Sequence, residues 1–176
     1  YSKINNLLNS NLMAKIQING SIVKQATLGN KEAIKAMFQT FMAEDETIIS
    51  VEYLGSYGVF FTTKSFVCIT DKKVASMEYG PFGKIVYSDA FIEEVNSGVI
   101  YQPSVFTLYF IGVILCISIF GILLLNAWVR CYYKVNKSGM VWCVREGVNI
   151  YAFANRSKIN LVNEIWRSAS YLQRKR

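Results

Sequence analysis

Residues Val105–Leu125 read VFTLYFIGVILCISIFGILLL, a stretch of 21 residues without a charged side chain. A helix needs about 20 apolar residues to cross the ~30 Å hydrocarbon core of a bilayer. Pro103 precedes the stretch, as suits the start of a helix. A buried helix in the core of a soluble domain is the alternative, but the stretch is longer than most cores require. It therefore predicts one transmembrane helix, within a segment at 104–134 that includes its interfacial end.

Aromatic and basic residues flank this stretch on both sides. Aromatic rings at the headgroup level, with cations just beyond them, are typical of an anchored membrane helix. We therefore expect the following residues to lie at a membrane interface: Tyr101, Tyr109, Trp128, Arg130, Tyr132, Tyr133 and Lys134.

Charge is divided unevenly about the stretch. Residues 1–103 carry nine lysines, no arginine and ten acidic residues, a net charge of −1, whereas residues 104–176 carry ten basic and two acidic residues, a net charge of +8. The positive-inside rule then places the C-terminal side in the cytoplasm, matrix or stroma. The predicted location is a bacterial cytoplasmic membrane or an organelle membrane (mitochondrial inner or thylakoid), with the protein integral to it.

Composition excludes several classes of chemistry. The chain has no histidine, which removes Ser-His and Cys-His nucleophiles and histidine-ligated zinc. Its four cysteines, Cys68, Cys116, Cys131 and Cys143, form no CxxC pair, so neither a zinc ribbon nor a dithiol redox site is indicated. We therefore predict a protein that is not an enzyme, with no catalytic residue, no metal site and no cofactor.

Short elements surround the apolar stretch. After an N-terminal extension at 1–29, Asn30 can cap an amphipathic helix at about 31–43. Short β-branched or aromatic segments then predict antiparallel strands up to residue 102, among them YGVFFTT at 57–63. MVWCVRE and NIYAFAN predict a later hairpin, and an amphipathic helix follows at about 157–173. We therefore divide the chain into a β-rich lobe at 30–102 and a basic ββα lobe at 135–176.

Two motifs carry a family resemblance. Thr70-Asp71-Lys72-Lys73-Val74 matches the hairpin of bacterial pleckstrin-homology-like (PH-like) domains, and residues 86–92 match the following strand loosely, without its proline. The chain resembles this family over about 46–102 and 138–173. The resemblance implies a PH-like antiparallel meander or barrel closed by a C-terminal helix. The predicted fold class is thus an α+β membrane protein, with a PH-like β meander, amphipathic helices and one transmembrane helix.

The membrane segment interrupts the region of resemblance. A single crossing would leave the two halves on opposite faces of a membrane, where they could not form one barrel. A re-entrant hairpin bending near Gly112 or Gly121 would keep them together, but arms of about 15 residues reach only ~22 Å. Length, interfacial aromatics and charge favour the single crossing.

The functional expectation is a non-enzymatic single-pass subunit that anchors and scaffolds a larger membrane complex. Its partners would be other membrane protein subunits and the lipid bilayer, with no role for nucleic acid. The alternative is a PH-like module that senses anionic lipid headgroups at a membrane surface. Four basic residues are candidates for such contact: Arg156, Lys158, Arg167 and Arg174.

Overall fold

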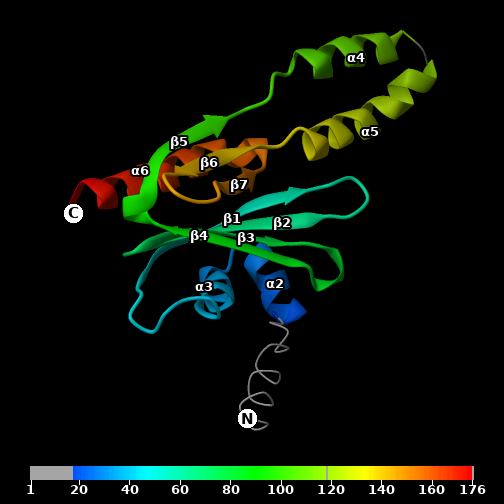
Figure 1. Cartoon of the computed structure of the whole chain (residues 1–176). Coiled ribbons are helices and arrows are strands. Elements are labelled where there is room, and N and C mark those ends of the chain that lie inside the picture. The colour runs from blue at the N-terminus through cyan, green and yellow to red at the C-terminus, as the bar shows by residue number, and fades with distance from the viewer. Residues whose placement is uncertain (1–17, 118, 176) are drawn as a thin grey trace, which may run out of the picture.

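The computed structural model describes residues 18–117 and 119–175 (Figure 1). Most of the predicted N-terminal extension, residues 1–17, lies outside the described residues. The helices are α2 (Gly20–Thr27), α3 (Lys31–Gln39), α4 (Phe106–Cys116), α5 (Ile119–Val135) and α6 (Ile159–Lys175). The strands are β1 (Ile48–Tyr57), β2 (Thr63–Thr70), β3 (Lys73–Tyr79), β4 (Ile85–Phe91), β5 (Val95–Tyr101), β6 (Ser138–Val144) and β7 (Ile150–Ala154).

Helix α3 begins where the sequence predicts. The side chain of Asn30 accepts hydrogen bonds from the backbone N–H groups of Glu32 (3.0 Å) and Ala33 (3.3 Å), which caps the first turn. Its buried face carries Ile34 and Phe38, both with no exposed surface. The helix ends at Gln39, earlier than expected.

The first sheet has the antiparallel order β1-β2-β3-β4 and is buried on both faces. Strand β2 shows why, because its side chains alternate between two separate cores. Phe66 and Cys68 pack with α2 and α3 on one face, whereas Val67 and Ile69 pack on the other. Figure 1 shows α2 and α3 below this sheet and the second sheet above it.

The second sheet has the antiparallel order β5-β6-β7, and α6 packs against it. The core that it shares with the first sheet includes Trp142, which is fully buried, together with Val162 and Ile165 from α6. In β5 and β6, Tyr101 is paired with Gly139. Strands from both sides of the apolar stretch therefore build one sheet and one core.

The segment predicted as a strand at 57–63 is not one, because residues 58–62 lie outside the strands. It forms the connection between β1 and β2, which turns at Gly58 with φ of +100°. A Cβ at this position would lie 2.1 Å from the carbonyl oxygen of Phe61. Only glycine fits this turn, and the turn leaves Phe60 and Phe61 exposed.

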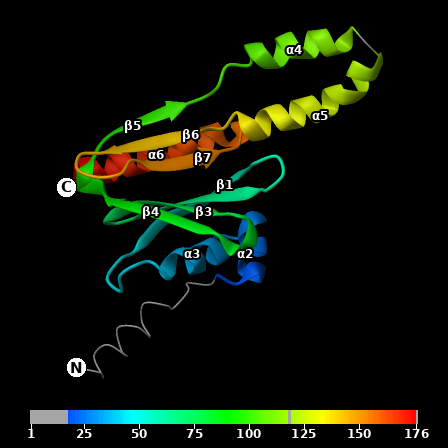
Figure 2. The same cartoon turned by 45° about the vertical axis from the view of Figure 1, so that its right-hand side comes forward.

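Residues 105–125 do not form one long helix. The chain reverses direction between the end of α4 and the start of α5, so that these two helices lie side by side as a hairpin projecting from the two sheets (Figures 1 and 2). The arms are in contact at Gly112, where a Cβ would lie 3.6 Å from Cδ1 of Leu125, an ordinary van der Waals distance. Helix α4 has 11 residues and is therefore about 16 Å long.

Several sequence expectations are therefore corrected. Over residues 18–117 and 119–175, no helix combines the length and the hydropathy needed to cross a bilayer. The chain is α+β with two antiparallel sheets, and the predicted membrane fold with one transmembrane helix is wrong. The predicted location as an integral membrane protein is contradicted by the same finding. The placement of the two halves on opposite faces of a membrane is also wrong, because β5 pairs with β6.

Candidate functional site

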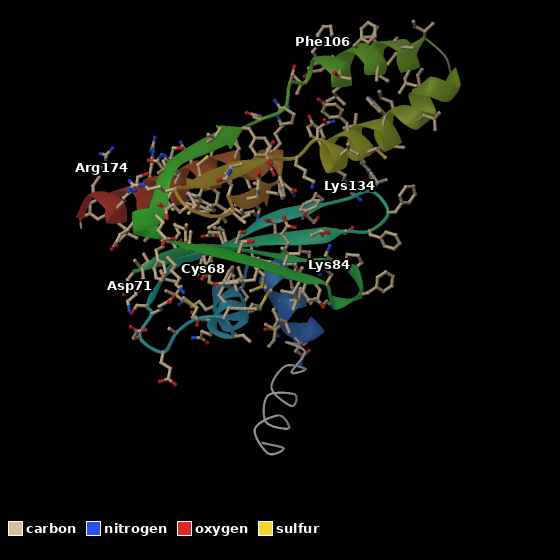
Figure 3. The ribbon with its side chains drawn as sticks, viewed as in Figure 1. Cys68, Asp71, Lys84, Phe106, Lys134 and Arg174 are labelled. Carbon is tan, nitrogen blue, oxygen red and sulfur yellow. The ribbon has the colours of Figure 1, made fainter. Side chains whose placement is uncertain are left out.

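The hairpin exposes an unusual amount of apolar surface. No charged residue lies between Glu94 and Arg130, so both arms are uncharged over most of their length. Figure 3 shows side chains standing away from both arms, with Phe106 labelled at the start of α4. Nine large apolar side chains among those that the structure describes in the hairpin are more than half exposed: Phe106, Tyr109, Phe110, Val113, Ile114, Ile117, Ile122, Leu124 and Val135. Contiguous apolar surface of this kind marks an interaction site.

The base of the hairpin is held together by aromatic residues of α5. The hydroxyl of Tyr132 donates a hydrogen bond to the carbonyl oxygen of Ser104, and Nε1 of Trp128 lies 3.4 Å from the carbonyl oxygen of Leu108. The Trp128 and Tyr132 rings are 6.0 Å apart. Tyr132 is 4% exposed. These contacts join α5 to the start of α4 and fix where the arms leave the sheets.

The predicted interfacial residues separate into three groups. Trp128, Tyr132 and Tyr133 gather at the base of the hairpin, next to Arg130 and Lys134, which are exposed. Tyr109 lies farther out on α4 and is 67% exposed. Tyr101 instead belongs to β5 and packs on Phe153 with ring centroids 6.5 Å apart, where burial raises the pKa of Tyr101 to about 12.

The base of the hairpin also rests on the connection between β1 and β2. The backbone N–H of Gly58 donates to the carbonyl oxygen of Lys134 at 3.2 Å. Phe60 in this connection is 92% exposed, and Phe61 lies 5.8 Å from the ring of Phe82 in the connection between β3 and β4. Sequence reasoning missed Phe60 and Phe61 because it assigned residues 57–63 to a strand. The glycine before two phenylalanines is the signal that could have indicated a turn.

The basic residues of the two halves differ in their partners. Four lysines of the first half form ion pairs: Lys31 with Glu52, Lys35 with Glu32, Lys72 with Asp45, and Lys73 with Glu46 and Asp89. Between Arg130 and Arg174, no basic residue forms an ion pair with another described residue. The net positive charge of the second half is therefore not neutralised by neighbouring carboxylates.

Of the four candidates for anionic contact, two lie far from the hairpin. Arg167 and Arg174 flank a shallow hollow of about 320 Å³ on α6. Figure 3 places Arg174 at the opposite end of the sheets from Lys134. The structure therefore does not bring these two arginines to the base of the hairpin.

The other two candidates lie in the turn from β7 to α6. The ammonium of Lys158 donates to the carbonyl oxygen of Tyr53 at 2.5 Å and lies 4.6 Å from the centre of the Tyr53 ring. Burial lowers the pKa of Lys158. Its contacts hold α6 against β1. Arg156, in contrast, lines a cavity with Lys134.

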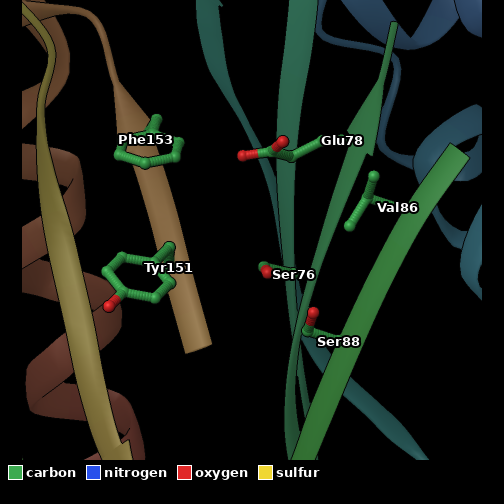
Figure 4. Close-up of a pocket in the computed structure, with 6 residues that line it drawn as sticks. All are labelled: Ser76, Glu78, Val86, Ser88, Tyr151 and Phe153. Carbon is green, nitrogen blue, oxygen red and sulfur yellow. The ribbon is translucent and has the colours of Figure 1, made fainter. Parts of the chain in front are cut away.

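A second cavity lies between the two sheets (Figure 4). It measures about 290 Å³, and Tyr151 and Phe153 of β7 face Glu78 across it, with Val86 of β4 and two serines completing the lining. Burial, and then Glu78, raises the pKa of the nearby Tyr57.

Acidic residues near β1 serve the fold. Glu46 is almost fully buried and lies 3.1 Å from the ammonium of Lys73, which also lies 3.2 Å from Asp89. Burial acts to lower the pKa of Lys73, but its hydrogen bonds to the two carboxylates outweigh this effect and raise it. Within the part of the chain that the structure describes, no three cysteine, aspartate or glutamate side chains are grouped as ligands for a metal ion.

Comparison with known proteins adds no relative. None of the protein-family models, curated proteins or solved structures that were compared matches the chain. The resemblance to PH-like domains therefore stays a prediction. The functional argument rests on the hairpin and on the charges at its base.

Proposed function

We propose that this protein binds peripherally to an anionic lipid surface, with the α4–α5 hairpin as the contact element. The observation that carries the proposal is the hairpin itself, which is uncharged from Phe106 to Val129 and exposes large apolar side chains on both arms. Burial of such side chains is the dominant favourable term in membrane-surface binding. The proposal includes no catalytic step.

Lipid suits this surface better than a groove on a protein. Exposed apolar residues come from both arms, such as Phe110 and Ile114 on α4 and Ile122 and Leu124 on α5. A groove that bound one helix would leave the outer side of the other in water, whereas lipid surrounds both arms. Helix α4 ends at Cys116 and α5 begins at Ile119, so nearly all described residues of the hairpin have their backbone groups within a helix, as a hydrocarbon environment requires.

The length of the arms suits one leaflet. The uncharged parts of α4 and α5, residues 106–116 and 119–129, have 11 residues each and measure about 16 Å. This is roughly half of the ~30 Å hydrocarbon core. Trp128 would then lie near the headgroups, with Arg130 and Lys134 at or beyond them, which is the order favoured at an interface. The hairpin would enter one leaflet without crossing it.

Charge supports an anionic surface over a neutral one. Arg130 and Lys134 at the base of the hairpin are exposed and form no ion pair with another described residue, so they are free to meet lipid phosphates. Each lysine or arginine close to an anionic surface contributes about 1 kcal/mol. Exposed Phe60 and Phe82 in neighbouring connections add apolar contacts beside the hairpin.

Vesicle flotation with the full chain tests the proposal. We expect binding to vesicles of phosphatidylcholine with 20% phosphatidylglycerol, and weaker binding to phosphatidylcholine alone. A membrane-impermeant maleimide, read out by peptide mass spectrometry, should label exposed Cys116 on α4 in free protein and much less in vesicle-bound protein. Cys143, on β6, is the internal control and should not change. Unaltered labelling of Cys116, or no binding to either vesicle, would contradict the proposal.

The expectation of a scaffolding subunit in a larger complex is a separate matter. The single membrane crossing in that expectation is contradicted by the described helices, and the partner proteins stay a prediction. Recovery of a protein partner whose binding protects Cys116 in the absence of lipid would favour that role over lipid binding.

A further inference from the structure

A cavity of about 530 Å³ opens where the hairpin meets the sheets. Ser56 at the end of β1, Tyr133 and Lys134 at the end of α5, and Asn155, Arg156 and Ser157 in the turn from β7 to α6 line it. Its volume lies within the ~300–1,000 Å³ of ordinary ligand sites. Three segments that are distant in sequence therefore meet at one cavity.

The cavity is lined for an anion. It has two cationic side chains, several hydroxyl and amide groups, and no carboxylate. Lys134 forms no ion pair with a described residue. Arginine and lysine are the residues that bind phosphate best in proteins, the first through a planar fork and the second as a point charge.

Arg156 is held in place and left incompletely bonded. Its Nε and Nη2 lie 3.0 and 3.3 Å from the side-chain amide of Gln102, whose oxygen accepts both bonds when the amide is turned toward them. Its Nη1 is buried and has no hydrogen-bond partner in the part of the chain described by the structure. A buried charged donor without an acceptor carries a free-energy penalty, which favours movement of the guanidinium toward an anion in the cavity.

We infer that this cavity binds the phosphate group of an anionic lipid headgroup, with Arg156 and Lys134 as its cationic contacts. The inference rests on the proposed function, since it assigns the lipid to a surface that the hairpin has already brought to the bilayer. Lys134 follows the uncharged part of α5 by one helical turn, so the cavity lies at the level where headgroups begin. The hairpin supplies apolar affinity, and the cavity supplies the preference for negative charge.

The test compares three full-length variants that each lose one positive charge. Lys134→Gln and Arg156→Gln alter the cavity, and Lys134 is exposed, so its replacement does not disturb the core. Arg145→Gln is the matched control, because Arg145 is exposed at the end of β6 that points away from the hairpin. Affinity is measured by flotation on vesicles of phosphatidylcholine alone and of phosphatidylcholine with 20% phosphatidylglycerol.

We expect each cavity variant to lose about tenfold in affinity for the anionic vesicles and to keep the wild-type affinity for neutral vesicles. Arg145→Gln should stay within about twofold of wild type on both. Equal losses in all three variants would overturn the inference in favour of diffuse charge, while leaving the proposed function intact. If the wild type bound to neither vesicle, the proposed function would be wrong, and so would the inference that the phosphate in the cavity belongs to a lipid.

A second measurement separates lipid from free phosphate. Inorganic phosphate should raise the melting temperature of the wild type, compared with chloride at equal ionic strength, and should not raise that of Lys134→Gln or Arg156→Gln. If phosphate raised the melting temperature but the protein bound both kinds of vesicle equally, the cavity would be a site for a soluble phosphate. The inference that it binds a lipid headgroup would then be wrong. Failure of both measurements would overturn the cavity as an anion site.

Discussion

Replacement of Val113 by aspartate tests whether the hairpin is the element that meets lipid. Val113 lies near the middle of α4 and is 65% exposed, so the change leaves the packing of the arms intact. Valine and aspartate have similar helix propensities, which makes a loss of the helix itself unexpected. The melting temperature should therefore stay close to that of the wild type.

The expected loss of affinity has two parts. Burial of the exposed part of Val113 in lipid contributes about 1 kcal/mol. Aspartate costs ~2.5–3.5 kcal/mol at the centre of a bilayer and less toward its surface, so a position halfway along an arm of about 16 Å should cost about 1–2 kcal/mol. The sum, about 2–3 kcal/mol, corresponds to roughly 30- to 150-fold weaker binding.

Flotation against increasing lipid concentration measures this change. The matched control is Leu28→Asp, which introduces the same charge at a residue that is 82% exposed after α2, on the far side of the first sheet. Its affinity should stay within about twofold of wild type. Wild-type affinity in Val113→Asp would refute the assignment of the hairpin as the contact element. Equal losses in the two variants would show that net charge, and not position, governs binding.

Two further predictions concern the fold. A Cβ at Gly98 in β5 would lie 2.4–2.7 Å from ring carbons of Trp166, so Gly98→Ala should lower the free energy of unfolding in urea by about 1–3 kcal/mol. Gly20→Ala, where no atom lies within 4 Å, should be neutral or slightly stabilising. Burial raises the pKa of Cys68 to about 12, whereas the same thiol in the unfolded chain has a pKa of ~8.5. The folded state therefore binds the thiol proton more strongly than the unfolded chain does. The stability that this thiol contributes is complete below ~8.5 and is lost as pH rises toward 12. The wild type should therefore lose stability above pH ~8.5 faster than Cys68→Ala, by at most ~1.4 kcal/mol per pH unit, and identical slopes in urea titrations would contradict the assignment.

Local signals in the sequence predicted much of the sheet region. Asn30 followed by an amphipathic pattern located the start of α3, and the hairpins of β2 with β3 and of β6 with β7 were visible from their turns. These features depend on residues close together in sequence, which is why they can be inferred without a structure. The strand predicted at 57–63 failed because one positive φ at Gly58 outweighs the β propensity of its neighbours.

The hairpin could not be predicted in the same way. A uniformly apolar stretch such as Val105–Leu125 shows no periodicity that separates one long helix from two short ones. What favours two arms is the pairing of Tyr101 with Gly139, which returns the chain to the sheet that it left. That contact joins residues on both sides of the stretch and has no local signal.

For the candidate site, the sequence shows only which residues are neighbours along the chain. Trp128, Tyr132 and Lys134 follow the apolar stretch and lie at the base of the hairpin, while their place at a membrane interface stays a prediction. The proximity of Arg156 to Lys134 depends on how β7 and α5 meet, so it required the structure. Phe60 and Phe82 likewise reach this end of the molecule only through turns.

The insertion of the hairpin between two paired strands also bears on how the chain folds. Pairing of β5 with β6 requires closure of a loop that runs from Tyr101 to Gly139, and an open loop of that length costs conformational entropy that grows with its number of residues. Formation of α4 and α5 first, fastened by the bond from Tyr132 to Ser104, brings the two strand ends together and leaves only short flexible segments to close. The hairpin thus converts a contact that is distant in sequence into a nearly local one, and its early formation would speed the completion of the second sheet.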